Sequence, residues 1–594
     1  MCGIAGIIDF KKNINAKHLA KMRNALIHRG PDGHGSDIEK QVGLTMRRLS
    51  IIDVKGGDQP LFNEDKTISI VGNGEIYNFV ELRKELQNCG HKIRTKSDIE
   101  LAIHAYEEWG IKKAVSKFRG QFALAIHDKK SGIVFLVRDR MGEKPIYYTK
   151  RNNTFAFASE MKSLLTLPWI DKSINYEAVD DYMHYYYVPE PKTLFKNIQK
   201  LPSGFYLQID LKNQQVKIDE YWSAKNIEVS FKGNPINRIK KEFAKACELT
   251  LRSDVPVGIS LSGGIDSGSI LAFCAPKYQN LQAFSIGYEG SPKSDERASA
   301  KNLAKKFGVK FNQVEIKTKD VVKYFPTLVK NMDDPVADIA GHAIHAVSKL
   351  ARQKGIKVLL GGVGGDEIFW GYPSTINATK ENIKNSKKSF FNIFRKKNFI
   401  FKNPDPSTTG FLISTLYSSK FKSKIDKDNY MKYLRPIKSK SSLEIAKHSL
   451  GLTRDLWLKS DVITLSDRLS MANSIELRSP FLDYKLVEVA LSSKQNLLGF
   501  TLPPKYWFKK AMSEILSKEV LDRPKQGFTP PVADWIAKIN KKYAKLLKNG
   551  FLVQSEILDK NKIDTFNNLF KNIPAYSIYQ LILLEIWGRK FVWN

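Results

Sequence analysis

The chain has few cysteines and no long apolar run, and both absences restrict what it can be. Its four cysteines form no CxxC pair and no zinc-like spacing with the ten histidines, so we expect neither disulfides nor a structural metal. No segment approaches the ~20 consecutive apolar residues that cross a bilayer, and residues 1–10 lack the charged-then-apolar order of a signal peptide. The sequence therefore predicts a cytoplasmic protein.

Acidic residues are also scarce relative to basic ones. The chain has 95 Lys and Arg against 61 Asp and Glu, a net charge of +34 that could attract nucleic acid, anionic lipid or an acidic substrate. The basic residues are scattered along the chain, which favours a solvated surface over a nucleic-acid module. One exception is a Phe-rich basic insert at about 378–410. We expect its phenylalanines to pack on their own domain, and contact with a membrane surface or a partner is the alternative.

The length of 594 residues allows two to four domains at roughly 150 residues each. Residues 1–206 contain short apolar or alternating segments typical of strands, at 2–10, 122–128, 133–139, 144–149 and 154–160. Residues 129–132 end in Gly and predict a hairpin turn between two of these strands. We interpret 1–206 as a domain of sheets covered by helices.

The pattern changes after a polar stretch at 207–235, which we interpret as a linker. Strand-like segments at 257–262, 281–287, 309–316 and 358–362 alternate with helical segments, the order that builds a parallel sheet in an α/β domain. In the helix expected after Asp295, Ala300, Leu303, Ala304 and Phe307 fall on one face. From Phe411 to the end the pattern is mainly helical, so residues 236–594 are predicted to form the second domain.

Cys2 is a candidate nucleophile because of its position. Removal of Met1 would leave one residue with both a thiol and a free α-amine, and the amine can accept the thiol proton near neutral pH. A lone cysteine is more often a small buried residue, which is our interpretation of Cys89, Cys247 and Cys274. The motifs around Cys2 favour the nucleophile.

Those motifs lie at 2–6, 28–32, 48–53, 73–78 and 97–98, and together they resemble the glutaminase domain of class II, N-terminal nucleophile, glutamine amidotransferases. The resemblance implies an αββα sandwich in which Cys2 attacks the glutamine amide, with Asn73 and the Gly74 N–H as oxyanion hole. It also implies that Arg48, Glu75 and Asp98 bind glutamine. A guanidinium suits the substrate carboxylate, and carboxylates suit its ammonium and amide donors.

A second chemical site is expected at Ser262-Gly263-Gly264-Ile265-Asp266-Ser267, which follows a strand and precedes a helix. Backbone N–H groups and the helix dipole would converge there on an anion. No Walker A loop is present, which argues against a P-loop NTPase. The strand ends Ser285-Ile286-Gly287 and Gly361-Gly362 should flank a nucleotide, because open α/β sheets bind ligands at the carboxyl ends of their strands.

The SGGIDS string is similar to the pyrophosphate-binding loop of ATP enzymes that adenylate a substrate. The resemblance implies ATP contacts from Ser262, Gly263, Gly264 and Ser267, and Mg²⁺ held by Asp266 and by Asp366 of a GGDE loop, since Mg²⁺ prefers oxygen ligands. Segments 467–471, 476–483 and 523–528 resemble those of asparagine synthetases, and by this resemblance Lys525 stabilises phosphate charge during adenylation.

The whole chain therefore resembles the glutamine-hydrolysing asparagine synthetase family. The resemblance implies that ammonia released at Cys2 travels inside the protein to an acyl-adenylate, with aspartate as the favoured acceptor, and that the chain can form a homodimer. Val363 stands where the family usually has an acidic residue, and segment 338–345, in which we expect His342 and His345 on a helix face, also departs from the family pattern. A sugar uronic acid is the alternative acceptor, and a basic RNA-binding adenylating protein is a third hypothesis.

Overall fold

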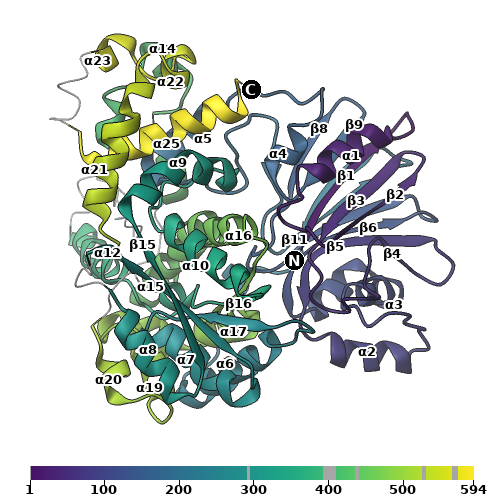
Figure 1. The fold of residues 1–594 in the computed structure, drawn as a ribbon, viewed down its shortest axis with the longest axis horizontal. Helices are drawn as coiled ribbons and strands as arrows, with labels where there is room; N and C mark the ends of the chain where they lie inside the picture. The colour runs from purple at the N-terminus through teal and green to yellow at the C-terminus, as the bar shows by residue number, and fades with distance from the viewer. Residues whose placement is uncertain are drawn as a thin grey trace.

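The computed structural model describes residues 2–290, 295–391, 410–427, 429–434, 441–524, 530–564 and 573–593. Figure 1 shows two halves that lie side by side, with the N-terminal strands in purple and blue beside a teal, green and yellow half that holds most of the helices. Helix α25 (Ala575–Phe591), which precedes the end of the described chain, lies at the end of the molecule where helices of both halves meet.

The N-terminal half is a sandwich of two six-stranded sheets. The first sheet has the order β10-β8-β9-β1-β3-β2 (Gln199–Lys200, Tyr147–Arg151, Thr154–Ala158, Gly3–Asp9, Val42–Arg48 and Gly33–Glu39). The second has the order β12-β11-β7-β6-β5-β4 (Gln215–Glu220, Phe205–Asp210, Ile133–Arg138, Gly120–Asp128, Ile68–Ile76 and Leu61–Phe62). Apolar side chains of both sheets form one buried cluster between them, including Ile4, Ile8, Val71 and Leu136.

Helices cover the outer faces of both sheets. Helix α1 (Ala16–Asn24) and α4 (Met161–Leu164) pack on the first sheet, and α2 (Phe79–Asn88) and α3 (Glu100–Lys117) pack against the second. This arrangement confirms the predicted αββα fold. The predicted hairpin is present between β6 and β7, where Gly132 has a φ of 75°, a conformation that suits glycine.

The structure corrects the expected linker. Strands β11 and β12 pair with each other over Phe205–Glu220, and β11 also pairs with β7, so the second sheet continues well beyond residue 206. Leu207 and Ile209 are fully buried in the sandwich. The polar residues that indicated a linker belong to the turn and to the edge strand β12, where one face meets solvent.

The second half is built on a parallel five-stranded sheet of order β15-β14-β13-β16-β17 (Lys310–Ile316, Gln282–Tyr288, Val257–Ser260, Val358–Leu360 and Glu476–Arg478). The four predicted strands are confirmed, and β17 was not predicted because it is only three residues long. In α8 (Arg297–Lys306), Ala300, Leu303 and Ala304 are buried as expected, and Phe307 follows as a partly buried cap.

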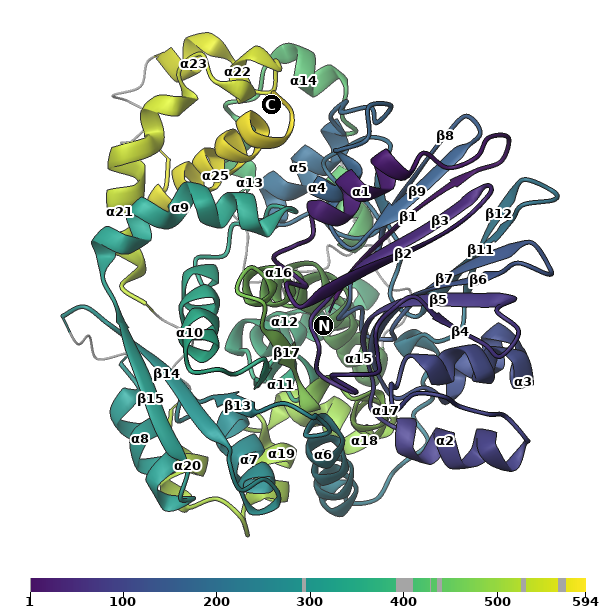
Figure 2. The ribbon, with the colours of Figure 1, turned by 45° about the vertical axis from the view of Figure 1, so that its right-hand side comes forward.

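The remainder of the described C-terminal region is helical, as predicted, apart from β17. Figure 2 shows some of these helices beside the sheet and others above it, in the group that contains α25. Its longer members are α6, α7, α9, α10, α12, α15, α16, α17 and α21 (Ile236–Thr250, Ile265–Cys274, Thr318–Met332, Gly341–Gln353, Pro373–Phe391, Ser442–Leu452, Thr464–Met471, Tyr484–Ser492 and Val532–Tyr543), with a π-helix, η4, at Thr453–Ile463.

One helix of the N-terminal half crosses to the second half. Helix α5 (Tyr176–Tyr185) packs beside α25, where the Tyr182 hydroxyl donates to the Gln580 carbonyl at 3.0 Å and the Gln580 amide donates back to the Tyr182 carbonyl at 2.6 Å. The two halves therefore share one apolar cluster, which contains side chains of α1, α5 and α25.

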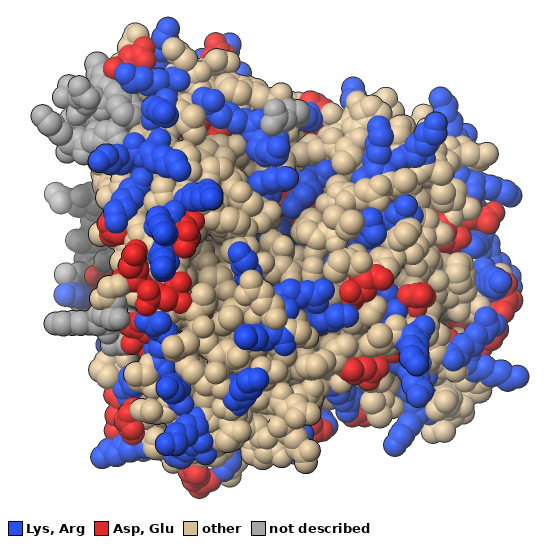
Figure 3. Space-filling view, viewed as in Figure 1, with Lys and Arg blue, Asp and Glu red and all other residues tan. Residues whose placement is uncertain are grey.

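The surface charge is spread, as expected for a solvated surface. Figure 3 shows Lys and Arg over the whole visible face with Asp and Glu among them. Residues 392–409 of the basic insert, including Phe394, Phe399 and Phe401, lie outside the described residues. Within the described ranges, no helix combines the length and the apolar character needed to cross a membrane.

Candidate active sites

Cys2 lies directly before β1 and is buried. Its backbone nitrogen donates to Asn73 Oδ1 at 3.0 Å, and its carbonyl accepts from Arg29 Nε at 3.1 Å. That nitrogen becomes the α-amine when Met1 is removed, so the candidate base is held beside the candidate oxyanion hole. Burial raises the pKa of the Cys2 thiol, although the Leu49 N–H and the Arg48 guanidinium oppose this shift, so the thiol needs a base to react.

The expected oxyanion hole has an available donor. Asn73 is fully buried on β5, and its Nδ2 has no hydrogen-bond partner among the described residues. Gly74 follows with a φ of 130°, and a Cβ there would lie 2.0 Å from the Gln121 carbonyl oxygen, so only glycine fits. A buried amide N–H₂ without a partner beside a nucleophile suits developing negative charge.

Arg48 is held by its own loop. Its Nη1 and Nη2 donate to the carbonyls of residues 52–54, the shortest at 2.7 Å, and Nη1 also contacts Asp58 Oδ1 at 2.8 Å. The charge of the guanidinium also opposes the rise in the pKa of Cys2. The guanidinium fixes the loop that follows β3.

The two carboxylates expected to bind glutamine lie together and are buried. Asp98 accepts the Ile76 N–H at 2.8 Å, and burial raises its pKa to about 6. Burial, together with the Asp98 charge, raises the pKa of Glu75 well above its usual value. Glu75 Oε2 has no hydrogen-bond partner among the described residues, which leaves an acceptor open to a ligand.

Arg478 stands in a segment that resembles asparagine synthetases, but the sequence did not indicate that it contacts the glutaminase site. It lies on β17 in the second half, yet its Nη2 is 3.5 Å from Glu75 Oε1. Its Nε donates to Glu476 at 2.5 Å, and its Nη1 donates to the Thr250 and Arg252 carbonyls at 2.9 and 2.7 Å. A cation of the synthetase half is thus fixed beneath a carboxylate of the glutaminase half.

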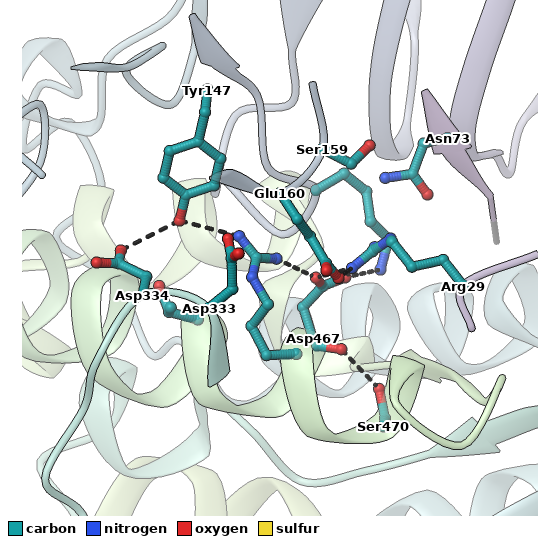
Figure 4. Close-up of polar contacts among 12 residues, drawn as sticks. Arg29, Asn73, Tyr147, Ser159, Glu160, Asp333, Asp334, Asp467 and Ser470 are labelled. Atoms are coloured by element: carbon teal, nitrogen blue, oxygen red, sulfur yellow. Dashed lines mark hydrogen bonds and ion pairs between the residues drawn. The ribbon is translucent and has the colours of Figure 1, made fainter. Parts of the chain in front are cut away.

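A buried ion network joins the two halves next to Cys2 (Figure 4). Arg29 Nη1 contacts Glu160 at 2.8 Å and Asp467 at 2.9 Å, and its Nη2 reaches the other Asp467 oxygen at 3.0 Å. Tyr147 extends the network by donating to Asp334 at 3.1 Å and accepting from Arg468 at 2.9 Å. Arg29 and Asp467 stand in motifs that indicated the family, but their pairing across 438 positions could not be predicted.

The second site forms where β13, β14 and β16, which are neighbours in the sheet, end at one edge. Helix α7 begins at Ile265 with Gly264 as its N-cap, and the hydroxyls of Ser262 and Ser267 lie 3.1 Å apart across the loop. Gly263 has a φ of 73°, and its carbonyl accepts from Arg523 at 3.1 Å. A helix N-terminus with hydroxyls and a tight glycine turn can hold a phosphate group.

The two carboxylates expected to hold Mg²⁺ come together. Lys505 Nζ contacts Asp266, and it lies 2.7 Å from Asp366 Oδ1. Both carboxylates lie at the end of the sheet, and Gly365 leaves them room, because a Cβ there would be 2.7 Å from Asp266 Oδ1. A position already shared by a cation and two carboxylates fits a divalent ion. Lys505 was missed because it stands in no recognised motif.

The other expected nucleotide contacts flank this loop. The end of β14 contains three of them, Ser285, Ile286 and Gly287, which come just before its last residue. The other two, Gly361 and Gly362, come directly after β16. A Cβ at Gly362 would lie 2.9 Å from Asp266 Cβ, which shows how closely the two loops approach. Lys525 lies outside the described residues.

The segment expected near the acceptor forms the start of α10. His342 is buried with its ring centroid 5.7 Å from that of Trp535, and burial lowers its pKa to about 3. The His345 Nδ1 lies 2.9 Å from Asn473 Nδ2. Both histidines lie on this helix, as predicted.

Among the described residues, three small cavities are lined by side chains of both halves. The Tyr77 cavity has a volume of about 10 Å³, the Val363 cavity about 20 Å³ and the Tyr147 cavity about 10 Å³. The first two share Glu143, Ser479 and Leu482 in their walls, and Glu143 also lines the third. Each holds about one molecule the size of water. The Tyr77 cavity is lined by a residue two positions after Glu75, and the Val363 cavity by a residue three positions before Asp366.

The fold and these two sites define a glutamine-dependent ligase with separate glutaminase and synthetase domains. Family models agree: the model for the glutamine amidotransferase domain matches residues 1–222, and the model for asparagine synthase matches residues 238–587. The chain belongs to the asparagine synthase family.

Curated relatives match along most of the chain. "Asparagine synthetase [glutamine-hydrolyzing] 1" of Bacillus subtilis (strain 168) is 32% identical over 90% of this chain and 88% of its own. "Putative asparagine synthetase [glutamine-hydrolyzing] 2" of Methanocaldococcus jannaschii is 34% identical over 67% of this chain and 80% of its own. The match to a solved glutamine PRPP amidotransferase of B. subtilis covers 61% of this chain and 81% of that chain. Its sequence identity is 14% and its TM-score is 0.29, which is too low to show a shared fold.

Proposed function

We propose that the chain makes asparagine from aspartate, glutamine and ATP. Glutamine is hydrolysed at Cys2 in residues 1–206, ammonia passes inside the protein, and residues 236–594 convert the acceptor carboxylate into an acyl-adenylate, β-aspartyl-AMP. Ammonia displaces AMP. The products are asparagine, glutamate, AMP and pyrophosphate.

The glutaminase chemistry follows from the Cys2 surroundings. The α-amine takes the thiol proton, the sulfur attacks the glutamine amide carbon, and Asn73 Nδ2 and the Gly74 N–H donate to the oxyanion. The amide nitrogen leaves as ammonia with the proton from the amine, and water then hydrolyses the thioester to glutamate. Asp98 and Glu75 accept hydrogen bonds from the substrate ammonium, and Arg48 binds its carboxylate.

The row of cavities through Glu143 supports internal transfer. Confinement would keep ammonia from being protonated and diluted in bulk water, which raises its effective concentration at the acyl carbon. Leu482 lines both the Tyr77 cavity and the Val363 cavity, so a larger side chain there would obstruct passage between them.

In the synthetase domain the loop at 262–267 binds the pyrophosphate part of ATP, and Ser285–Gly287 with Gly361–Gly362 flank the adenosine. Asp266 and Asp366 would hold Mg²⁺, which when bound neutralises phosphate charge. Lys525 stabilises charge at the α-phosphate, and Lys505 keeps the two carboxylates together before nucleotide binds.

Val363 favours one alternative acceptor. Its cavity is walled partly by the apolar side chains of Ile463, Leu477 and Leu482, where an acidic residue would orient ammonia. Since Val363 and segment 338–345 depart from the family pattern near the expected acceptor, another carboxylate such as a sugar uronic acid is the second candidate. Acceptor-dependent pyrophosphate release, measured for aspartate and for uronic acids, separates the two: release with aspartate alone supports asparagine synthesis, and release with uronic acids alone contradicts it.

The proposed transfer path can be tested by measuring coupling, which is the amount of amide formed per glutamine hydrolysed. In Leu482→Phe we expect the amide formed per glutamine hydrolysed to fall several-fold, because the ring fills the shared wall, while synthesis from ammonium salts changes less. Leu482→Met conserves volume and is the matched control. Equal coupling in both variants would contradict the path.

We also expect a location in the cytoplasm, a homodimer, and peripheral membrane contact through the basic insert at about 378–410. Nucleic acid is not expected as a partner.

A further inference from the structure

Metal-binding side chains gather in the glutaminase domain away from both sites, between the segment after α2 and the first turns of α3. His91, His104 and Glu107 each present one ligand atom, and these atoms all lie within 4.8 Å of one another. His104 and Glu107 are three residues apart on α3, so they share a helix face. The cluster takes no part in the proposed reaction.

His104 is the buried member. Only 1% of its side chain is exposed, and neither ring nitrogen makes a hydrogen bond among the described residues. Its Nδ1 lies 3.5 Å from Glu107 Oε2. That separation is close to the roughly 3.4 Å between two ligands of a tetrahedral ion bound at about 2.0–2.1 Å.

The surroundings hold these groups as the outer shell of a metal site does. His104 Nε2 faces Glu100 Oε1 at 3.7 Å, and Glu100 itself accepts the N–H groups of Arg94 and Thr95 at 2.8 and 2.7 Å. The second Glu107 oxygen accepts from Asn63 Nδ2 at 2.8 Å. A carboxylate behind the far ring nitrogen, and a hydrogen bond to a ligating carboxylate, orient metal ligands in this way.

His91 and Glu108 complete the cluster on the solvent side. The ring centroids of His91 and His104 are 5.2 Å apart, and His91 Nε2 lies 3.2 Å from Glu108 Oε2. The His91 side chain is 16% exposed and that of Glu108 is 34% exposed, so an ion can enter from solvent.

We propose that His91, His104 and Glu107 bind a divalent transition metal of the zinc class, with Glu108 or water as the fourth ligand. Imidazole and carboxylate groups in this number suit Zn²⁺ and Co²⁺. Sequence spacing predicted no such site, because one histidine comes from a loop and the other two ligands from a helix. The ion would tie α3 to the segment that leads to Asp98.

The test is a Co²⁺ titration of the full chain after chelator treatment, followed by visible absorption and calorimetry. We expect wild type to bind one more equivalent than the His91→Asn/His104→Asn double variant, with the absorption of tetrahedral Co²⁺. His34→Asn, a change at an exposed histidine on β2, is the control and should bind as wild type does. Equal stoichiometry in wild type and the double variant would overturn the proposal.

The single variant His91→Asn provides a second test in case the double variant does not fold. His91 is partly exposed, so its replacement should leave the fold intact. It should lower Co²⁺ affinity at least tenfold, and Zn²⁺ should raise the unfolding temperature of wild type and His34→Asn but not of His91→Asn. An unchanged affinity in His91→Asn, or a wild type that binds no ion, would leave His104 as a buried imidazolium between carboxylates and contradict the site.

Discussion

The glutaminase site and the synthetase site differ in how completely the polypeptide forms each of them. At the first, Cys2, Asn73 and Asp98 are buried and fixed by backbone hydrogen bonds at 2.8 to 3.0 Å. At the second, Asp266 and Asp366 are about 20% exposed and are held together by a lysine. The first site is therefore preorganised for one small substrate, whereas the second has charges that ligands must rearrange.

Replacing Cys2 should give the largest effect and separate the two sites. In Cys2→Ala we expect glutamine hydrolysis to fall at least about 10³-fold, because the nucleophile is gone. Synthesis from ammonium salts should persist, since the synthetase site lies in the other domain. Assays of glutamate and pyrophosphate release check both, and loss of both activities would contradict separate sites.

Asp266→Ala should have the opposite effect to Cys2→Ala: the synthetase site should lose activity and the glutaminase site should keep it. Pyrophosphate release should fall about 10²-fold or more even with ammonium salts present, because charge stabilisation at the phosphates is lost. Glutamine hydrolysis should continue at a measurable rate. Full pyrophosphate release in the variant would remove the 262–267 loop from the ATP site.

Asp467→Asn tests the buried network that joins the halves. Removing one partner of a buried ion pair leaves Arg29 with one carboxylate fewer, so we expect a loss of about 3 kcal/mol in the free energy of unfolding. The control is Lys245→Gln, at a pair whose side chains are 40% and 43% exposed. This variant should lose less than about 0.5 kcal/mol of the free energy of unfolding, measured for both variants by urea denaturation. Similar losses in both variants would show that the network adds no stability.

The smallest effect expected is a pH dependence at the first site alone. Burial raises the pKa of Asp98 to about 6, above the value of an unfolded Asp. The folded protein therefore binds more protons between about pH 4 and 6, and this group destabilises the fold as pH rises through that window. Glutamine binding needs the ionised form of Asp98, so kcat/KM for glutamine should fall as the pH drops through about 6. A rise centred near pH 4 would contradict the shift.

The fold could largely be predicted because local patterns control it. Alternation identified strands such as 122–128 and 133–139, and the βα order identified the parallel sheet. The prediction failed at β11 and β12, where two buried residues, Leu207 and Ile209, are hidden among polar ones. The short β17 has too few residues to show a pattern.

The sites could be predicted only where a motif carried the residues. Cys2 and Asp266 stand in such strings, and among the described residues the structure places Cys2 beside Asn73 and Asp266 beside Asp366. Arg478 and Lys505 were missed because their roles arise from tertiary contacts: Arg478 reaches Glu75 across the interface, and Lys505 reaches two loops that follow different strands. No spacing in a single sequence encodes such pairs.

The central claim is that nitrogen released at Cys2 is consumed at the second site without leaving the protein. The direct measurement is product labelling with amide-¹⁵N glutamine in the presence of unlabelled ammonium salt. We expect the new amide to carry the label of glutamine almost undiluted at saturating glutamine. An amide whose label falls in proportion to the ammonium added would show that nitrogen mixes with solvent and would contradict the account.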